Sequence, residues 1–400
     1  MAQPLGGKTV VLGVTGSIAC YKAADLASKL VQSGATVKVM LSHSARKFVS
    51  PLTFSGITHQ PVITDLFEEE QGSGIGHINI ANQADILVAA PSTANLIAKL
   101  SHGIADDAFT TTVLASKAPL LLAPAMDGNM YQNMAFQRNL KAIKQMGAYV
   151  LGPAKGRLAS GMTGYGRMVE IPELLENILW IVGKDGDLRG RKVVVTAGGT
   201  QEAIDPVRFI GNRSSGKMGY AVAIAARNRG ANVVLISAPT NLPKPAGIAL
   251  TNVKTSHDML VAVLAASDKA DAVIMAAAPA DFRPSAVSRT KIKKTMTQWD
   301  LPLERTEDIL SQIDSAVIKV GFAAETNDLI RYAKSKLSKK GAHLFVANDI
   351  TNPGSGFGTD TNQVTLLDAE GHQEQLPLLD KHDVADHILD RLVKLLPGAN

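Results

Sequence analysis

The sequence predicts an α/β protein made of two Rossmann-like or flavodoxin-like domains with mainly parallel sheets. The first observation is a pair of similar segments, 10–19 and 193–200, in which an apolar strand runs into a turn of small and hydroxylated residues. Such a turn points backbone N–H groups at whatever lies above the sheet, and the helix that follows adds partial positive charge. The second observation is the alternation of strand and helix patterns along both halves, which is typical of parallel sheets.

Length and composition fit two domains that act on small molecules. Four hundred residues exceed one ordinary domain, and 46% hydrophobic residues suffice for a large core. The formal net charge of +5 is mild and dispersed, with its densest basic runs at 291–294 and 334–340. Only 4% of residues are aromatic, and they do not interleave with basic residues. A nucleic-acid partner is therefore not expected.

Cys20 is the only cysteine, so an intrachain disulfide is excluded and a reducing cytoplasm is the expected location. Its place in the first helical segment, beside Ile18 and Ala19, favours a buried packing role. The chain enters a strand pattern almost at once, without the basic and apolar leader of a secreted protein. No apolar run reaches the roughly 20 residues that span a bilayer, and no membrane partner is expected.

We predict a domain boundary near the middle of the chain. The first half has strand patterns at 9–14, 36–41, 85–90, 119–123 and 148–151 and a closing helix at 172–182. Two of these strand patterns are apolar throughout, which indicates strands covered on both faces. The glycine-rich segment 184–190 is the expected linker between domain 1–183 and domain 191–400.

The second half repeats the pattern. Strands are expected at 192–197, 232–237, 272–277, 317–321, 343–347 and 363–368, with a final helix near 382–396. Ligands of open α/β sheets bind beyond the carboxyl ends of the strands, where polar turns occur in both halves. The segment 152–166 carries five glycines and no apolar periodicity. We expect it to form a mobile flap outside the core.

The motifs of the first half resemble, in their order, the flavin-containing cysteine decarboxylases, and most of all the phosphopantothenoylcysteine decarboxylase half of bifunctional coenzyme A biosynthesis proteins. They are Gly16-Ser17-Ile18-Ala19, Gly76-His77-Ile78, 90–95, Pro124-Ala125-Met126 and Gly166-Arg167-Met168. The resemblance implies an FMN that oxidises the cysteinyl end of the substrate to a thioaldehyde, so that carbon dioxide can leave. His77 would be the base, because histidine has a suitable unperturbed pKa. The residues that would hold FMN are Gly16, Ser17, Ser92, Thr93 and Asn95.

Two positions depart from the pattern of this family. Similar enzymes carry asparagine after Pro-Ala-Met, where this chain has Asp127, and cysteine in the flap, where it has Ser160. The family's cysteine serves as an acid, and a serine hydroxyl is a far weaker acid than a thiol with a pKa of about 8.5. Asp127 would repel a substrate carboxylate unless it is protonated or paired. Either another proton donor, such as Asp127 or water, replaces the cysteine, or decarboxylation is impaired.

From about residue 190 the chain resembles the phosphopantothenate–cysteine ligase half of the same proteins. The motifs are 196–200, 205–210, 212–219, 277–281, 291–294 and 321–326. The resemblance implies that CTP activates the carboxylate of 4′-phosphopantothenate as an acyl-cytidylate, which cysteine then attacks. Because two anions must approach each other, lysines and Mg²⁺ would neutralise their charge.

The resemblance also assigns the ligase site. Lys291 would meet the nucleotide phosphates, and Asn212 would bind the acyl-cytidylate in a pocket shaped by Asp205 and Arg208. The other CTP-binding positions would be Met275, Ala276, Ala277, Asp281, Thr306, Glu307, Asp308, Ile309, Phe322, Lys336 and Lys340. Lys336 and Lys340 lie four residues apart and could equally form an exposed helix face. No dedicated set of protein metal ligands is expected, and the family implies a homo-oligomer with trimeric and dimeric contacts.

Two other classes of protein are compatible with parts of the sequence. An NAD(P)-dependent reductase would also contain strand–turn–helix units, but neither turn has G-x-G-x-x-G spacing with an acidic residue about 20 positions on. The run Ser214-Ser215-Gly216-Lys217 lacks the full spacing of a Walker phosphate loop. A flavin-binding regulatory or assembly subunit is compatible with Asp127 and Ser160, and only for the first half.

Overall fold

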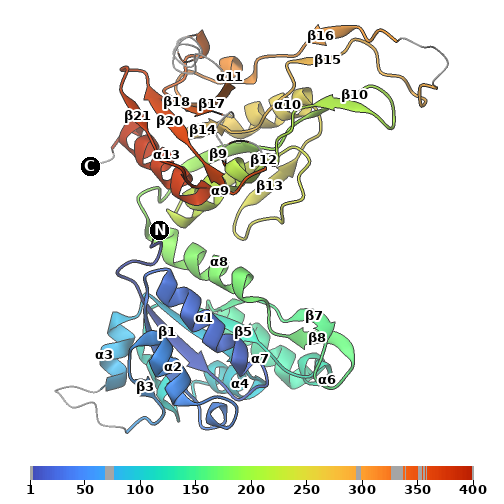
Figure 1. Cartoon of the computed structure of the whole chain (residues 1–400). Helices are drawn as coiled ribbons and strands as arrows, with labels where there is room; N and C mark the ends of the chain where they lie inside the picture. Colours follow the sequence, from blue (N-terminus) through green and yellow to red (C-terminus); the bar gives the residue numbers. More distant parts are fainter. Residues whose placement is uncertain are drawn as a thin grey trace. The chain divides into compact units, whose positions relative to one another are not determined.

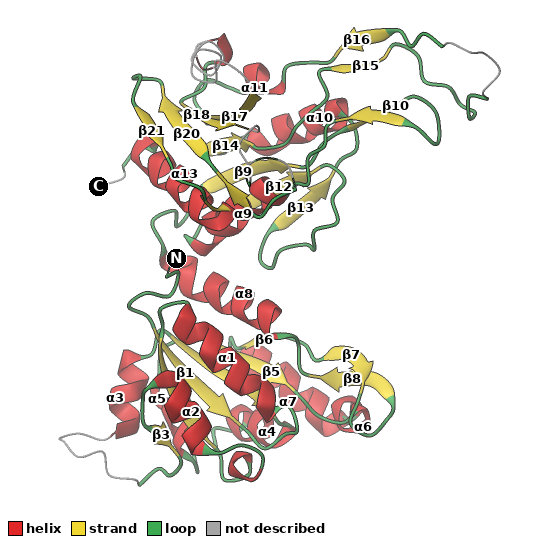
Figure 2. Ribbon diagram, viewed as in Figure 1, coloured by secondary structure: helices red, strands yellow, loops and turns green. Residues whose placement is uncertain are grey.

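The computed structural model describes residues 3–67, 76–293, 299–325, 337, 339–349, 354, 356 and 358–398. The chain divides into two compact units, Met1–Val182 and Gly183–Asn400. Each unit has a mainly parallel sheet with helices packed on both faces (Figures 1 and 2). The predicted fold class is confirmed.

Unit 1 contains a six-stranded parallel sheet with the strand order β3-β2-β1-β4-β5-β6. Because the chain leaves β1 first to one side and then to the other, the carboxyl ends of β1 and β4 form the switch point where such sheets bind ligands. The strands are β1 (Thr9–Val14), β2 (Thr36–Leu41), β3 (Val62–Ile63), β4 (Ile86–Ser92), β5 (Leu120–Pro124) and β6 (Tyr149–Val150).

Helices cover the two faces of this sheet and form two apolar cores. Successive residues of β1 point to opposite faces, so Val10 and Leu12 belong to one core and Val11 to the other. The first core is closed by α1 (Cys20–Gln32), α2 (Pro51–Thr58) and α8 (Ile171–Val182). The second is closed by α3 (Gly76–Gln83), α4 (Ala94–Ser101), α5 (Ala108–Ala115) and α7 (Met134–Gln145).

The glycine-rich segment 152–166, expected to form a mobile flap outside the core, forms an antiparallel hairpin of β7 (Ala154–Arg157) and β8 (Thr163–Arg167) (Figure 2). The hairpin is separate from the main sheet, as the prediction requires, and its mobility stays a prediction. The sequence analysis did not predict its two strands, because backbone pairing needs no apolar periodicity.

Unit 2 contains an eight-stranded sheet with the order β13-β12-β9-β14-β17-β18-β20-β21. The pairings from β13 to β18 are parallel, and the pairings of β20 with β18 and with β21 are antiparallel. The switch point lies between β9 and β14, where Gly199 bridges Ala278. The strands are β9 (Lys192–Ala197), β12 (Asn232–Ser237), β13 (Ala249–Asn252), β14 (Ala272–Met275), β17 (Ile318–Glu325), β18 (Leu344–Asp349), β20 (Val364–Asp368) and β21 (Gln373–Gln375).

Helices also cover both faces of this second sheet. One face carries α9 (Lys217–Asn228) and α13 (Lys381–Leu395), and the other carries α10 (Ser256–Ser267) and the short α11 (Ile309–Gln312). The segment expected to be a linker packs on unit 2. Leu188 is 0% exposed within the α9 core, and its backbone N–H donates to the carbonyl oxygen of Arg229 at 2.9 Å.

Two short hairpins of unit 2 project from its sheet and form what we call the arm (Figure 1). They are β10 (Gln201–Ala203) with β11 (Phe209–Gly211), and β15 (Phe282–Pro284) with β16 (Leu303–Arg305). The hairpins are joined where Ser288 donates its backbone N–H to the carbonyl oxygen of Ile204 at 3.0 Å.

Most strands of the two main sheets lie where the sequence predicts them. Four predicted ranges agree in full with observed strands. They are 9–14 (β1), 36–41 (β2), 192–197 (β9) and 232–237 (β12). The other predicted strands overlap β4, β5, β6, β14, β17, β18 and β20, and the closing and final helices correspond to α8 and α13. The sequence analysis did not predict the edge strands β3, β13 and β21 or the hairpins of the arm.

Candidate active sites

The structure joins the two polar turns at the switch point of unit 1. The turn after β1 and the turn after β4 are connected through Thr15, whose Oγ1 donates to the carbonyl oxygen of Pro91 at 2.8 Å and accepts from the N–H of Thr93 at 3.0 Å. Gly16 lies in close contact with the residues after β2, since a Cβ at this position would come within 2.4 Å of the Cβ of Ser44. Glycine is therefore needed for this turn to pack.

The polar side chains predicted to hold FMN have different surroundings. Ser92 is buried, and its hydroxyl donates to the carbonyl oxygen of Ala89 at 3.3 Å. Thr93 caps α4 by accepting from the N–H of Leu96. Asn95 is exposed, and the Ser17 hydroxyl accepts from the N–H of Ala19 at 3.3 Å. Three of the four side chains thus hold local structure. Among the described residues the hydroxyl hydrogen of Ser17 and the amide of Asn95 have no acceptor, so both can donate to a ligand.

Cys20 follows this turn at the start of α1. Its side chain is 0% exposed, and Sγ donates to the carbonyl oxygen of Thr15 at 3.2 Å. Burial raises the pKa of the Cys20 thiol, which keeps it protonated at neutral pH. The predicted packing role is confirmed.

A cavity of about 470 Å³ lies between α1, the turn after β5 and the β7–β8 hairpin. It brings together Ser17, Asp127 and Ser160 of the predicted site. The other lining residues are Ile18, Ala19, Tyr21, Lys22, Ala125, Met126, Arg157, Leu158, Ala159, Gly166, Arg167 and Met168. His77 lies near the start of α3 and does not line this cavity, so its role as the base stays a prediction.

Asp127 and Ser160 form a hydrogen-bonded pair across this cavity. The hydroxyl of Ser160 donates to Oδ2 of Asp127 at 3.0 Å, and the N–H of Asn129 donates to Oδ1 at 2.9 Å. Asp127 thereby caps α6 (Gly128–Gln132). The backbone donor at Asn129 and then the Ser160 hydroxyl lower the pKa of Asp127, so this carboxyl is ionised at neutral pH.

The cationic side chains of this cavity differ in whether they form ion pairs. Lys22 is buried, donates to the carbonyl oxygen of Met168 at 3.3 Å and forms an ion pair with Glu170 at 3.0 Å. Arg167 pairs with the same carboxylate. Hydrogen bonding from Lys22 lowers the pKa of Glu170. Among the described residues Arg157 makes no ion pair, so its guanidinium is available to an anion.

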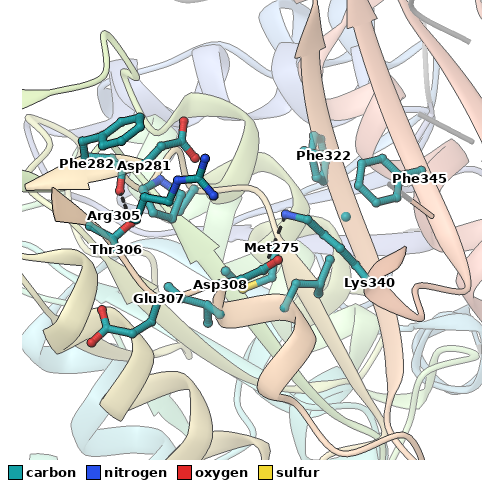
Figure 3. A pocket seen from close by; sticks show the side chains of 16 residues that line it. Met275, Asp281, Phe282, Arg305, Thr306, Glu307, Asp308, Phe322, Lys340 and Phe345 are labelled. Atoms are coloured by element: carbon teal, nitrogen blue, oxygen red, sulfur yellow. Dashed lines mark hydrogen bonds and ion pairs between the residues drawn. The ribbon is translucent and has the colours of Figure 1, made fainter. Parts of the chain in front are cut away.

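In unit 2 a cavity of about 440 Å³ opens beyond the ends of β14 and β17 (Figure 3). Lys340 and Asp308 face each other across it, with Nζ and Oδ1 3.5 Å apart. The Thr306 hydroxyl donates to the carbonyl oxygen of Ala280 at 2.7 Å and fixes the wall. Predicted CTP-binding residues in the lining are Met275, Ala277, Asp281, Thr306, Glu307, Asp308, Ile309, Phe322 and Lys340.

A second cavity of about 410 Å³ adjoins the first and shares with it Ala277, Pro279, Asp281, Phe322 and Lys340. Its lining includes two predicted residues that are absent from the first cavity, Ala276 and Asn212. The Asn212 amide donates to the carbonyl oxygens of Ala278 and Pro279 at 3.3 and 3.0 Å. This contact ties the loop that precedes α9 to the loop that follows β14.

Two lysines that the sequence analysis did not assign also line this second cavity. Lys217 begins α9 and donates to Oδ1 of Asp360 at 2.6 Å. Lys381 begins α13, is 5% exposed and donates to the carbonyl oxygen of Gly356 at 3.2 Å. Burial, with the nearby charge of Lys217, lowers the pKa of Lys381. The only signal for Lys217 was its place after Gly216 at a helix start, and Lys381 had none.

Lys291 does not lie with the other predicted residues. It is exposed on the arm, between β15 and β16, and lines neither cavity of unit 2. Asp205 and Arg208 likewise belong to the arm rather than to the pocket that they were expected to shape. Burial would raise the pKa of Asp205, but the N–H groups of Val207, Ile292 and Arg208 lower it. Lys336 lies outside the described residues.

The described part of the chain contains no helix both long and apolar enough to cross a membrane. Over the same residues, no three His, Cys, Asp or Glu side chains are grouped to hold a metal ion.

The fold and cavities describe a two-domain α/β enzyme, with one candidate site at each switch point. Family models agree: residues 2–183 match the model described as "Flavoprotein" and residues 188–396 the "DNA/pantothenate metabolism flavoprotein C-terminal domain". A relative from Bacillus subtilis, "Coenzyme A biosynthesis bifunctional protein CoaBC", is 47% identical over 98% of both chains. The chain therefore belongs to the family of bifunctional coenzyme A biosynthesis proteins.

Solved structures resemble each half separately. The C-terminal domain of a coenzyme A biosynthesis bifunctional protein covers 52% of this chain and 97% of its own, with 40% identity and a TM-score of 0.46. A PPC decarboxylase mutant complexed with pantothenoylaminoethenethiol covers 43% of this chain and 96% of its own, with 28% identity and a TM-score of 0.39.

Proposed function

We propose that unit 2 ligates 4′-phosphopantothenate to cysteine through an acyl-cytidylate formed with CTP, and that unit 1 decarboxylates the product with FMN to give 4′-phosphopantetheine. The observation that supports this assignment best is the full-length likeness to a coenzyme A biosynthesis bifunctional protein. The two adjoining cavities of unit 2 fit a reaction between two separately bound anions. The lone cysteine favours a reducing cytoplasm as the place of both reactions.

In the ligase reaction the first cavity takes CTP and the second takes 4′-phosphopantothenate. Lys340 lines both, so its charge lies where the carboxylate must approach the α-phosphate. Mg²⁺ would enter with the nucleotide, because it commonly uses one or two carboxylates together with substrate phosphates. Asp281 and Asp308 are the carboxylates of the first cavity that suit this role.

The second cavity suits the phosphate of 4′-phosphopantothenate. The N-terminus of α9 lies in its lining, with Lys217 and Lys381 beside it. Free backbone N–H groups and the helix dipole favour an anion at such a position. Lys217 and Lys381 add positive charge, which Asp360 offsets in part by its ion pair with Lys217. Asn212, which is already fixed by two carbonyl oxygens, would orient the acyl end near Lys340.

For unit 1, the residues at the switch point fit a flavin phosphate. Gly16 permits the close turn, Ser17 and Asn95 offer polar side chains, and Ser92 and Thr93 hold the second turn beside the first. Bound FMN supplies the oxidation that makes the carbon–carboxylate bond of the cysteinyl group labile. The β7–β8 hairpin would cover the substrate and exclude water, while Arg157 would attract its anionic groups.

We further propose that the chain acts as a homo-oligomer in which the arm contacts a second copy. The arm exposes a set of large apolar side chains, and such clusters mark interaction surfaces. They are Val207, Phe209, Phe282, Val287, Trp299 and Leu303. An interface here would explain why Lys291 is exposed in one chain, since the nucleotide phosphates that it would meet could lie in the cavity of the second copy.

The decisive experiment for the ligase is pyrophosphate release by the purified chain. Sustained release over many turnovers must require CTP, 4′-phosphopantothenate and cysteine together, with ATP as the comparison nucleotide. A single turnover of release with CTP and 4′-phosphopantothenate but without cysteine would report the acyl-cytidylate half-reaction. No release with all three substrates would contradict the assignment of unit 2. For unit 1, flavin absorbance and carbon dioxide release from phosphopantothenoylcysteine are the matching measurements.

A further inference from the structure

The charge of Asp127, which is paired with Ser160, affects how the proposed decarboxylation can proceed. Asp127 lies at the start of α6 and Ser160 in the loop between β7 and β8, so two separate elements bring them together at 3.0 Å. Both oxygens of Asp127 accept hydrogen bonds, and both residues line the same cavity. A ligand in this cavity therefore meets an oriented carboxylate.

The elements around Asp127 carry several ionisable groups, of both signs. The cavity lining contributes Tyr21 and Lys22 from α1, Arg157 from β7 and Arg167 from β8. The rings of Tyr131 in α6 and Tyr165 in β8 lie near each other, tilted by 35° with centroids 6.1 Å apart. Glu170 accepts both Lys22 and Arg167. None of these groups forms an ion pair with Asp127 within the described residues, so its charge is not neutralised by a direct partner.

The substrate of the proposed reaction brings a second carboxylate into this cavity. Two carboxylates at contact distance cannot both stay ionised without a large penalty, so the pair tends to share one proton. The carbon–carbon bond breaks, and carbon dioxide leaves without the bonding electrons, which the oxidised sulfur end of the substrate would accept. The carbon that lost carbon dioxide would bind a proton when the substrate is reduced again to the thiol, so the overall reaction consumes one proton.

We propose that Asp127 takes up a proton when the substrate carboxylate binds beside it, and returns that proton to the carbon that loses carbon dioxide, with Ser160 as a positioning residue. The inference rests on the proposed decarboxylase function of unit 1. Before the reaction the proton lies between two carboxylates, and afterwards only Asp127 remains. Loss of the second charge restores the acidity of Asp127, so the proton is released when the carbon can accept it.

Ser160 orients the carboxyl group of Asp127. Its hydroxyl donates to Oδ2 of Asp127, which favours the ionised form and fixes the plane of the carboxyl group. The remaining lone pairs of Asp127 can then face the cavity. Arg157 offers an opposing possibility, because its guanidinium could neutralise the substrate carboxylate directly. In that case Asp127 would stay ionised throughout.

Calorimetric proton counting on the flavin-loaded enzyme separates these two cases. The probe is phosphopantothenoylserine, which carries the carboxylate but has a hydroxyl in place of the thiol. Titrations in two buffers with different ionisation enthalpies give the number of protons bound per site. We expect uptake of roughly one proton near pH 6.5. A second probe, phosphopantothenoylethanolamine, carries the same phosphate but lacks the carboxylate. Subtracting its proton uptake removes the contribution of the phosphate group.

Asp127→Asn is the decisive variant, because asparagine caps a helix as well as aspartate but cannot hold the proton. We expect its carboxylate-dependent proton uptake to fall to zero, and formation of 4′-phosphopantetheine to fall by at least roughly tenfold. The matched control is Asp314→Asn, at an exposed residue of unit 2 whose Oδ1 also accepts from a backbone N–H two residues on. Unchanged uptake in Asp127→Asn, or no uptake in the native enzyme, would overturn the proposal.

The role of Ser160 is tested by the pH dependence of kcat. Since the protonated form of Asp127 is required in the complex, kcat should decline as pH rises. Ser160→Ala removes a bond that favours the ionised form, so the decline should move to higher pH, and Ser160→Thr should restore its position. If kcat of Ser160→Ala declines at the same pH as kcat of the native enzyme, the positioning role is contradicted. If phosphopantothenoylcysteine yields no carbon dioxide at all, the proposed function fails, whereas turnover without proton uptake defeats only this inference.

Discussion

Lys340 lines both ligase cavities, and among the described residues Asp308 is its one ion-pair partner. The Asp308 carboxylate lies 3.5 Å from its Nζ, and the ammonium group is only partly exposed. A cation fixed in this way can neutralise charge that develops as a carboxylate attacks a phosphate, without first reorganising. The distance is long enough for the ammonium to turn toward a bound nucleotide.

We therefore expect Lys340→Met to lower kcat/KM for CTP by about 100-fold, in the range found when one preorganised electrostatic donor is removed. Methionine keeps an unbranched apolar stem, so packing should change little. The measurement is initial pyrophosphate release across CTP concentrations. Lys339→Met is the matched control, because Lys339 precedes Lys340 and is exposed. An equal loss of kcat/KM in both variants would show that Lys340 has no specific role in the reaction with CTP.

Asp205 acts at a distance from the cavities by holding the arm. Its Oδ1 accepts from the N–H groups of Val207 and Arg208 at 2.8 Å each, and Oδ2 accepts from the N–H of Ile292 at 3.2 Å. Arg208 adds a bond from its guanidinium to the carbonyl oxygen of Ile292 at 3.0 Å. The position of Lys291 on the arm thus depends on a carboxylate far along the chain.

Asp205→Asn should release residues 288–293 while leaving the 205–208 turn intact, because the amide oxygen can replace Oδ1 but the NH₂ group cannot accept from Ile292. Hydrogen exchange of the 288–293 segment should become several-fold faster at pH 7. The folded-state pKa is lowered, so the carboxylate stabilises the arm above the usual aspartate pKa and loses this effect as pH falls through the lowered value. The two proteins should therefore converge in strongly acidic solution, and a constant difference would contradict this account.

At the scale of elements, the β7–β8 hairpin is held against the turn after β5 by one glycine. The N–H of Met126 donates to the carbonyl oxygen of Gly166 at 2.9 Å. A Cβ on Gly166 would lie 2.2 Å from the carbonyl oxygen of Met126, and its φ of +152° is also unfavourable for other residues. Gly164, two residues earlier on the same strand, has no neighbour closer than 4.0 Å to an added Cβ.

This difference predicts that Gly166→Ala lowers carbon dioxide release by at least roughly tenfold, because the hairpin must move away from Met126 and the cavity loses its shape. Gly164→Ala should stay within about twofold of the native enzyme. Ligase activity, measured in the same preparations, should be unchanged in both and reports that the chain is folded. Comparable decarboxylase rates in the two variants would show that the hairpin need not be held in this position.

The elements that the sequence predicted differ physically from those it missed. Buried parallel strands such as 193–197 are continuous apolar runs, which periodicity detects. The hairpins of the arm are three residues per strand, and β10 reads Gln-Glu-Ala, so backbone pairing forms them without a local signal. The turn residues Gly16 and Ser17 were found because they follow a strand directly. Lys217 and Lys381 were missed because the tertiary fold alone brings the starts of α9 and α13 to one cavity.

At the scale of the whole molecule, two sheets use the same strand order around a central first strand. Each unit has its own apolar cores, and no core cluster among the described residues contains side chains from both. Each unit should therefore fold and bind its ligands without the other. A fragment of unit 2 must begin at residue 183, because the segment 183–190 packs on unit 2.

We expect the fragment 183–400 to fold and to retain ligase activity, and the fragment 191–400 to be less stable. The second fragment lacks Leu188, which is fully buried against the α9 core. Loss of one buried leucine should lower the free energy of unfolding by about 2–3 kcal/mol, which urea denaturation of the two fragments can measure. Leu188→Ala within 183–400 isolates this contribution and should account for most of the difference. Equal stability of the two fragments would show that 183–190 is only a connection, as the glycine-rich sequence suggested.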